Sequence, residues 1–150
     1  MLMTLVLHIM EAARRRLAVL SREASLFDAA EILADPNTPL ALVCDSEGIA
    51  AGVITPSDVV KVLATARVYA CGLNADAIMA KPVLSCHLDD PLQRVWAFMN
   101  SRYLRSVPIL DDDGRPLGVV YARDVARALL DEATHEELLL RDYVMGVGYQ

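Results

Sequence analysis

Two stretches of this sequence decide its fold: Gly48–Ala64 (GIAAGVITPSDVVKVLA) and Gly114–Leu130 (GRPLGVVYARDVARALL). Each has a glycine, a second glycine four residues later, two aliphatic residues, and then an aspartate within an apolar-periodic run. The two stretches lie 66 residues apart, and the same offset pairs Leu26 with Leu92. Repetition at a fixed offset indicates two copies of one supersecondary unit.

Each copy predicts the element order β-α-β-β-α. Apolar residues recur at i, i+3, i+4 and i+7 in the first expected helix of each copy, which predicts one buried stripe. Two apolar runs around an acidic turn that ends in glycine predict a hairpin, and a second helix follows. The expected strands span 17–20, 40–44 and 49–54, then 83–86, 107–110 and 117–120; the expected helices span 26–33 and 56–64, then 92–99 and 122–130.

The 150 residues are expected to form a single α/β module. A unit of about fifty residues buries too little apolar surface alone, so two β-α-β-β-α repeats, 6–66 and 74–131, should pack together about a pseudo-two-fold axis. The tail, 132–150, should hold a helix from about His135 to Met145, ended by Gly146 and Gly148. Its apolar residues are expected to pack on the module or on a second chain: Leu138, Leu139, Tyr143 and Val144.

Composition narrows the class of protein. Hydrophobic residues make up 55% of the chain, which favours a folded core, and the net charge of −6 argues against a nucleic-acid partner. The opening MLMTLVLHIM is too short to span a bilayer, and its positive charges follow it, unlike those of a secretory signal. It is expected to form a helix or strand packed on the domain. Three cysteines without a C-x-x-C pair predict a reducing, cytoplasmic location.

The repeated motif resembles that of the CBS domain, which occurs in tandem pairs. The family pattern G-h-h-[TS]-x-x-D matches Gly52–Asp58 (GVITPSD) and Gly118–Asp124 (GVVYARD). The strand before the motif reads VPILD at 107–111, with the family's proline, and ALVCD at 41–45, without it. The resemblance covers roughly residues 6 to 130.

This resemblance implies a non-enzymatic regulatory module that binds an adenosine-containing ligand in clefts between the two repeats. AMP, ADP or ATP is expected, with NAD and S-adenosylmethionine as alternatives, and the module should pass the ligand state to an unidentified regulated protein. The family also implies a homodimer. Its aspartate holds the ribose hydroxyls, its threonine or serine contacts ribose or phosphate, and basic residues meet the phosphates. The matching positions are Thr55, Ser57, Asp58, Arg105, Pro108, Tyr121, Arg123 and Asp124.

Simpler interpretations of these residues remain open. Thr55 and Asp58 also match a helix N-cap and its third residue, whereas Tyr121 has no short side-chain oxygen with which to cap. Small residues beside the motif, Gly52 and Gly118, would let a ligand approach the backbone. The change from Thr55 to Tyr121 predicts that the two clefts differ. Each arginine is equally consistent with a solvated surface side chain.

Two other functions are weighed against the sensor. A dimeric scaffold with empty clefts needs no aspartate at either position, and an enzyme is the weakest reading because the sequence has no catalytic motif. His8, His87 and His135 lack metal-ligand spacing, so no metal is expected.

Overall fold

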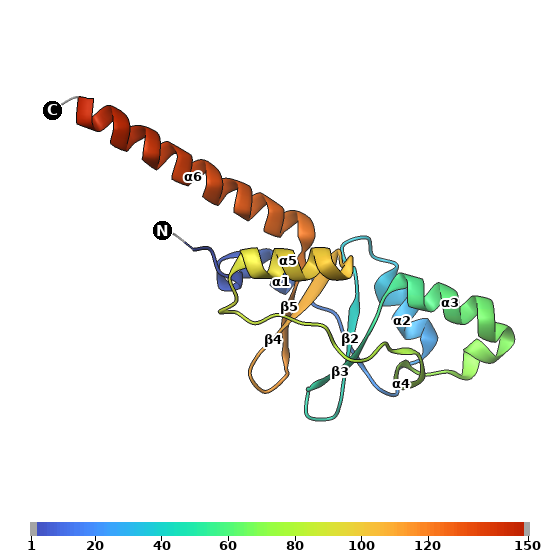
Figure 1. Ribbon diagram of the computed structural model, residues 1–150. Helices are drawn as coiled ribbons and strands as arrows, with labels where there is room; N and C mark the ends of the chain where they lie inside the picture. Colours follow the sequence, from blue (N-terminus) through green and yellow to red (C-terminus); the bar gives the residue numbers. More distant parts are fainter. Residues whose placement is uncertain (1–2, 149–150) are drawn as a thin grey trace.

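The computed structural model describes residues 3–148 as two small sheets that lie side by side, each packed against helices (Figure 1). The first sheet has the order β1-β2-β3 and the second has the order β4-β5. A long C-terminal helix leaves this body and projects away from it (Figure 1). The predicted α/β class and the two repeats are confirmed.

The first repeat contains all five predicted elements. Its strand β1 pairs in parallel with β2, and β2 pairs antiparallel with β3. Ser25 caps the first helix, because its hydroxyl accepts from the Asp28 N–H at 3.0 Å while the Asp28 carboxylate accepts from the Ser25 N–H. The elements are β1 (Val19–Ser21), α2 (Leu26–Leu33), β2 (Ala41–Cys44), β3 (Ala50–Ile54) and α3 (Pro56–Ala66).

The second repeat has the same order with a weaker first strand. Its elements are α5 (Leu92–Arg102), β4 (Ser106–Leu110), β5 (Pro116–Tyr121) and α6 (Ala122–Gly148). The strand expected at 83–86 is reduced to a single parallel bridge between Cys86 and Ile109. In the first repeat the Leu42 N–H donates to the Ala18 carbonyl at 2.8 Å. The residue equivalent to Leu42 is Pro108, which has no N–H, so the matching bond cannot form.

Both hairpins turn through the same aspartate–glycine arrangement. Asp45 Oδ1 accepts from the N–H groups two and four residues later, at 2.9 and 3.0 Å, and Asp111 Oδ1 does the same at 2.9 and 2.8 Å. The glycines that end these turns, Gly48 and Gly114, have φ values of +83° and +89°, a conformation that disfavours other residues. The hairpin prediction is therefore confirmed in its turn chemistry.

The segment that precedes each repeat crosses to the other one. The 3₁₀ turn η1 (Val6–Ile9) and helix α1 (Met10–Arg15) pack against the second repeat, whereas α4 (Ala75–Ile78), reached through η2 (Arg67–Gly72), packs against the first. A Cβ atom at Gly118 would lie 2.9 Å from the Ala13 backbone, and one at Gly52 would lie 2.6 Å from Met79 Sδ. The absence of a side chain at the two motif glycines therefore makes room for the crossing segments. From the sequence these glycines were expected to make room for a ligand instead.

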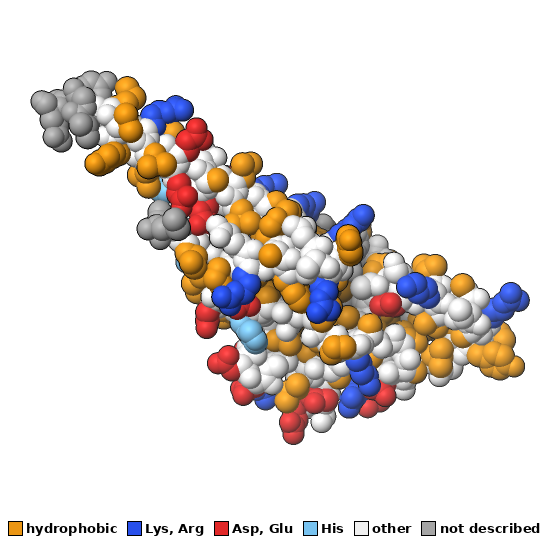
Figure 2. All heavy atoms as spheres, viewed as in Figure 1, with side chains coloured by type: hydrophobic (Ala, Val, Ile, Leu, Met, Phe, Trp, Pro, Cys, Tyr) orange, Lys and Arg blue, Asp and Glu red, His pale blue; other side chains and the backbone are white. Residues whose placement is uncertain are grey.

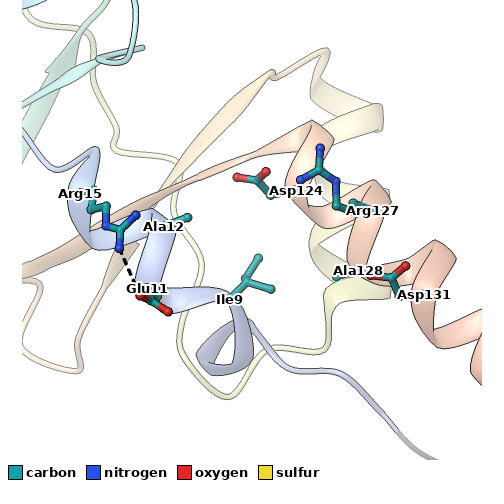
Figure 3. A pocket seen from close by; sticks show the side chains of 8 residues that line it. All are labelled: Ile9, Glu11, Ala12, Arg15, Asp124, Arg127, Ala128 and Asp131. Atoms are coloured by element: carbon teal, nitrogen blue, oxygen red, sulfur yellow. Dashed lines mark hydrogen bonds and ion pairs between the residues drawn. The ribbon is translucent and has the colours of Figure 1, made fainter.

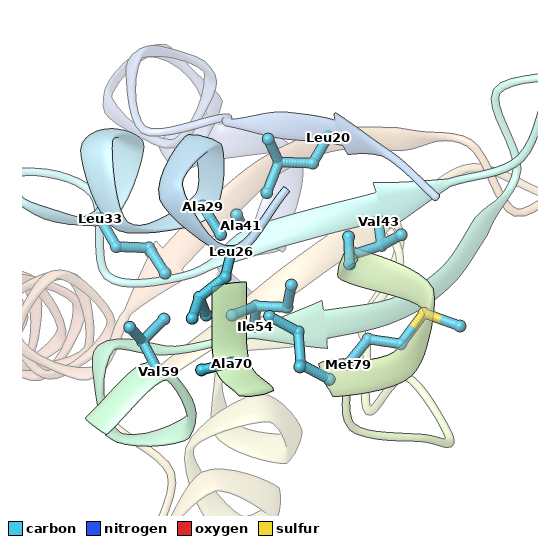
Figure 4. Close-up of a cluster of buried hydrophobic side chains, with 12 residues drawn as sticks. Leu20, Leu26, Ala29, Leu33, Ala41, Val43, Ile54, Val59, Ala70 and Met79 are labelled. Carbon is cyan, nitrogen blue, oxygen red and sulfur yellow. The ribbon is translucent and has the colours of Figure 1, made fainter. Parts of the chain in front are cut away.

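Three apolar clusters hold the body together. Leu26, Ile54 and Val59 belong to the first repeat's cluster, which Ala70 and Met79 from the crossing segment complete (Figure 4). In the second repeat the partly buried Trp96, which lies on the predicted apolar stripe of helix 92–99, packs against that repeat's cluster. A third cluster joins the sheets of the two repeats through Leu40, Leu42, Cys44 and Val119. Because this cluster contains residues of both repeats, the halves are fixed as one body.

Helix α6 differs from the sequence prediction. It is continuous from Ala122 to Gly148, whereas a helix ending near 130 and a separate one from His135 to Met145 were expected. The residues between those segments, Asp131 to Thr134, contain no glycine or proline that would end a helix. The apolar tail side chains do not pack on the module: Leu138, Leu139 and Tyr143 are 48%, 50% and 72% exposed.

Candidate functional site

One large cleft lies between the two repeats. Its volume is about 880 Å³, within the range of small-molecule sites in proteins. The first repeat contributes the end of β3 and the start of α3, and the second contributes the segments at the start of β4 and the end of β5. Six of the eight predicted ligand residues line this cleft: Thr55, Ser57, Asp58, Arg105, Pro108 and Tyr121.

Asp58 caps helix α3 with one oxygen of its carboxylate. Asp58 Oδ2 accepts from the Thr55 N–H at 2.9 Å and from the Thr55 hydroxyl at 3.0 Å. Asp58 Oδ1 makes no hydrogen bond to any residue that the structure describes, although the side chain lies in the cleft. The capping interpretation and the ligand interpretation are therefore compatible, because each uses a different oxygen.

The cleft carries more positive than negative side chains. Lys81, Arg102 and Arg105 line it from the second half of the chain, against Asp35 and Asp58 from the first. Asp35 Oδ1 already accepts from the Asn37 N–H at 2.9 Å. Such a surface favours an anionic ligand group, and guanidinium groups suit phosphate.

Arg123 lies beside this cleft rather than in it. It lines a neighbouring cavity of about 450 Å³ together with Arg105, Tyr121 and Ala122. The Arg123 guanidinium lies 4.9 Å from the centre of the Tyr121 ring. Since Arg105 and Tyr121 border both cavities, Arg123 is adjacent to the cleft across the tyrosine.

Asp124 is the second predicted ligand residue that lies outside this cleft. Its Oδ2 lies 2.5 Å from Arg16 Nη2, and the two side chains are 18% and 12% exposed. This oxygen is buried and has no aligned hydrogen bond in the described part of the chain. The positive charge of Arg16 therefore compensates the loss of hydration of the carboxylate. Asp124 also borders a separate cavity of about 420 Å³, which the η1–α1 segment lines with Ile9 and Arg15 among others (Figure 3).

Comparison with known proteins identifies the repeats. The family model of the CBS domain matches twice, at residues 8–65 and 75–131. The chain belongs to the CBS domain family. The matched ranges correspond closely to the two repeats that the 66-residue offset indicates.

Three similar proteins place this CBS pair among its relatives. It is 31% identical over 103 residues to an L-aspartate semialdehyde sulfurtransferase of Methanocaldococcus jannaschii, an alignment that covers 69% of this chain and 19% of that protein. A CBS domain pair solved with 5′-methylthioadenosine and S-adenosyl-L-methionine superposes with a TM-score of 0.73 at 27% identity, covering 87% of this chain and 99% of the other. A CBS-pair protein of Arabidopsis thaliana gives 0.73 at 21%, covering 89% and 99%.

Some residues that line the CBS cleft were missed from the sequence. Ala80, Lys81 and Pro82 lie just beyond the α4 crossing, and Arg102 and Tyr103 end helix α5. The first group belongs to no sequence motif. It is brought to the cleft by two backbone hydrogen bonds between Val53 and Ala80, at 2.8 and 3.1 Å, which the sequence does not reveal. A signal for the second group exists, since both residues precede the predicted Arg105 by three positions or fewer.

Other kinds of site were searched for in residues 3–148. Within that range no three His, Cys, Asp or Glu side chains gather as metal ligands would. None of the helices described there combines the length and apolar character needed to cross a membrane. Cys86 and Cys44 are buried free thiols; burial first, and then Asp90, raises the pKa of Cys86 to about 12, and burial and Asp45 raise the pKa of Cys44.

Proposed function

We propose that this CBS pair is a non-catalytic sensor that binds an adenosine-containing ligand in the cleft between its repeats. The observation that carries the proposal is the cleft itself, which brings the Thr55–Asp58 motif of one repeat against Arg105, Pro108 and Tyr121 of the other. A solved CBS pair at 27% identity holds 5′-methylthioadenosine and S-adenosyl-L-methionine, which supports the same ligand class here. CBS pairs are generally regulatory modules.

In this proposal each residue has a distinct role. The free Asp58 Oδ1 accepts hydrogen bonds from the ribose hydroxyls, as carboxylates do in dinucleotide-binding folds. Thr55 and Ser57 contact the ribose or phosphate, and the apolar surface at Pro108 and Tyr121 meets the base. These roles follow from the family pattern and from the position of each side chain in the cleft.

The charge of the cleft favours AMP, ADP or ATP over S-adenosylmethionine. Lys81, Arg102 and Arg105 supply three positive groups for phosphate, whereas the sulfonium of S-adenosylmethionine gains nothing from them. NAD also carries phosphates and stays a candidate. Arg123 extends the basic surface beyond Tyr121.

A thermal-shift series tests the ligand class. The melting temperature should rise with AMP and ATP more than with adenosine or S-adenosylmethionine, because a ligand that binds the native state stabilises it by RT ln(1 + [L]/Kd). The phosphate-dependent part should shrink at high salt, which screens exposed arginines. No rise with any of the four compounds at millimolar concentration would favour the alternative, a scaffold with an empty cleft.

The signalling state is proposed to be a cytoplasmic homodimer that acts on a separate regulated protein. The exposed apolar side chains of α6 support a protein contact on this helix (Figure 2). Cys44, Cys71 and Cys86 are free thiols in the structure, which agrees with a reducing compartment. Neither nucleic acid nor membrane belongs to the proposed partners.

A further inference from the structure

The large cleft between the repeats, called the open cleft below, has a pseudo-symmetric counterpart at the second repeat. The 66-residue offset relates Thr55 to Tyr121 and Asp58 to Asp124, and it relates Pro82, which lines the open cleft, to Arg16. The counterpart cluster is therefore Arg16, Tyr121 and Asp124. In the open cleft the corresponding three residues line the cavity, whereas at the second repeat Arg16 contacts both Tyr121 and Asp124.

Arg16 makes both contacts that a ligand would make with this cluster. Its guanidinium lies 3.9 Å from the centre of the Tyr121 ring, where a base would stack, and it pairs with the Asp124 carboxylate, which a ribose would otherwise use. Arg16 is 12% exposed, so its charge is weakly screened by solvent. The change from Thr55 to Tyr121 supplies the aromatic face on which the arginine stacks.

Arg16 is brought there by an insertion in the first repeat. The segment His8–Met10 matches Ala77–Met79 only if the first repeat carries three extra residues before Leu17. These lengthen the crossing segment into α1, which ends at Arg15, and Arg16 follows as its C-cap. Helix α1 crosses β5 in close contact at Gly118, which fixes the backbone at Ala13. Arg16 follows only three residues later, so this contact also positions Arg16.

We infer that Arg16 occupies the second ligand position of this CBS pair from within, so that the native chain has one adenosine-type site and a latent second one. The inference rests on the proposed function, because it takes the open cleft as the pattern for the latent site. Asp124 is then a partner of Arg16 and becomes a ligand residue only when the arginine is removed. A ligand at the latent position must displace both the ring contact and the ion pair.

Calorimetric titration of AMP and ATP into the full chain tests the inference through stoichiometry. Wild type should bind one ligand per chain, and Arg16→Ala should bind two. Asp58→Ala should weaken the open-cleft site by roughly tenfold to more than a hundredfold. Arg16→Ala combined with Asp58→Ala should then show one tighter site, at the latent position. Arg14→Ala is the matched control: this arginine of the same run is exposed and lines none of the three cavities described above, so its removal should leave one site.

The outcomes separate this inference from the proposed function. Two sites in wild type, or one site in Arg16→Ala and none in the double variant, would overturn the inference while the sensor stands. No binding in wild type but one site in Arg16→Ala would overturn the open cleft and leave the latent site standing. No binding by any variant would overturn both. If Arg16→Ala does not fold, Arg16→Gln, which is shorter and uncharged, carries the same expectations.

Discussion

At the scale of single residues, Asp58 is expected to contribute to folding and to binding through different oxygens. Its capping contacts to Thr55 repeat those that Asp28 makes with Ser25 in α2. Asp58→Ala and Asp28→Ala should therefore each lower the free energy of unfolding by about 1 kcal/mol. Asp58→Asn should cost less, because its amide oxygen still accepts from Thr55. Urea denaturation measures these differences, and equal losses for Asp58→Asn and Asp58→Ala would contradict the capping role.

The three cysteines should differ in reactivity. Cys44 and Cys86 are buried with pKa values raised by burial, so at pH 8 their thiolate fraction and their access are both low. Cys71 is exposed. A thiol-specific reagent should modify one cysteine rapidly in the folded protein and all three in denaturant. Cys71→Ser should abolish the rapid phase; rapid modification of three thiols in the native protein would contradict the described burial.

At the scale of elements, the crossings at Gly118 and Gly52 give a graded prediction. Gly118→Ala should destabilise the fold by about 1–3 kcal/mol, because its methyl group meets the rigid Ala13 backbone. Gly52→Ala should cost a similar amount, because the added methyl group would lie 2.9 Å from Met79 Cβ, an atom that the backbone holds in place. Gly72→Ala, with open space around it, is the control. Denaturant unfolding should separate Gly118→Ala and Gly52→Ala from Gly72→Ala, and an effect of Gly118→Ala no larger than that of Gly72→Ala would refute the crossing.

Local sequence patterns predicted the helices and strands well, but they did not predict that α1 and α4 pack on the opposite repeats. Helix α2 spans 26–33 as its apolar spacing predicts, and both hairpins turn at the predicted aspartate–glycine loops. The weak strand at 83–86 follows from Pro108, whose missing N–H was visible in the sequence but whose partner was not. The exchange of α1 and α4 between repeats depends on contacts distant in sequence, which periodicity does not encode.

The candidate site shows the same division. Four of its residues, Thr55, Ser57, Asp58 and Tyr121, were predicted from the motif, which lies where a strand meets a helix. Arg105 and Pro108 were predicted from the family resemblance outside the motif. A run of arginines such as Arg14–Arg16 is usually solvated surface, yet Arg16 is largely buried against residues more than a hundred positions away. The charge pattern alone cannot separate these cases, since the fold decides which arginine of the run meets Tyr121.

At the scale of the whole molecule, α6 predicts self-association. The exposed apolar side chains near its end include Leu140, Tyr143 and Val144, 67%, 72% and 68% exposed, which is unfavourable in water unless another chain covers them. The protein should sediment as a dimer at micromolar concentration, and Leu139→Asp together with Val144→Asp should shift it to monomer. A wild-type monomer at high concentration would contradict this assembly. Leu130 is also exposed but lies toward the start of the same helix, near the body, so Leu130→Asp is the control and should leave the dimer intact.

The central claim is that both repeats form one adenosine site, and calorimetric titration of AMP tests it most directly. Asp58→Ala from the first repeat and Arg105→Ala from the second should each weaken binding, the former by roughly tenfold to more than a hundredfold, as for a lost hydrogen bond of about 1.5–3 kcal/mol to a charged acceptor. Asp28→Ala, with the same capping role outside the cleft, and Arg94→Ala, an exposed arginine outside it, should bind as wild type does. Wild type that binds no AMP at millimolar concentration, or binding that neither cleft substitution weakens, would contradict the account.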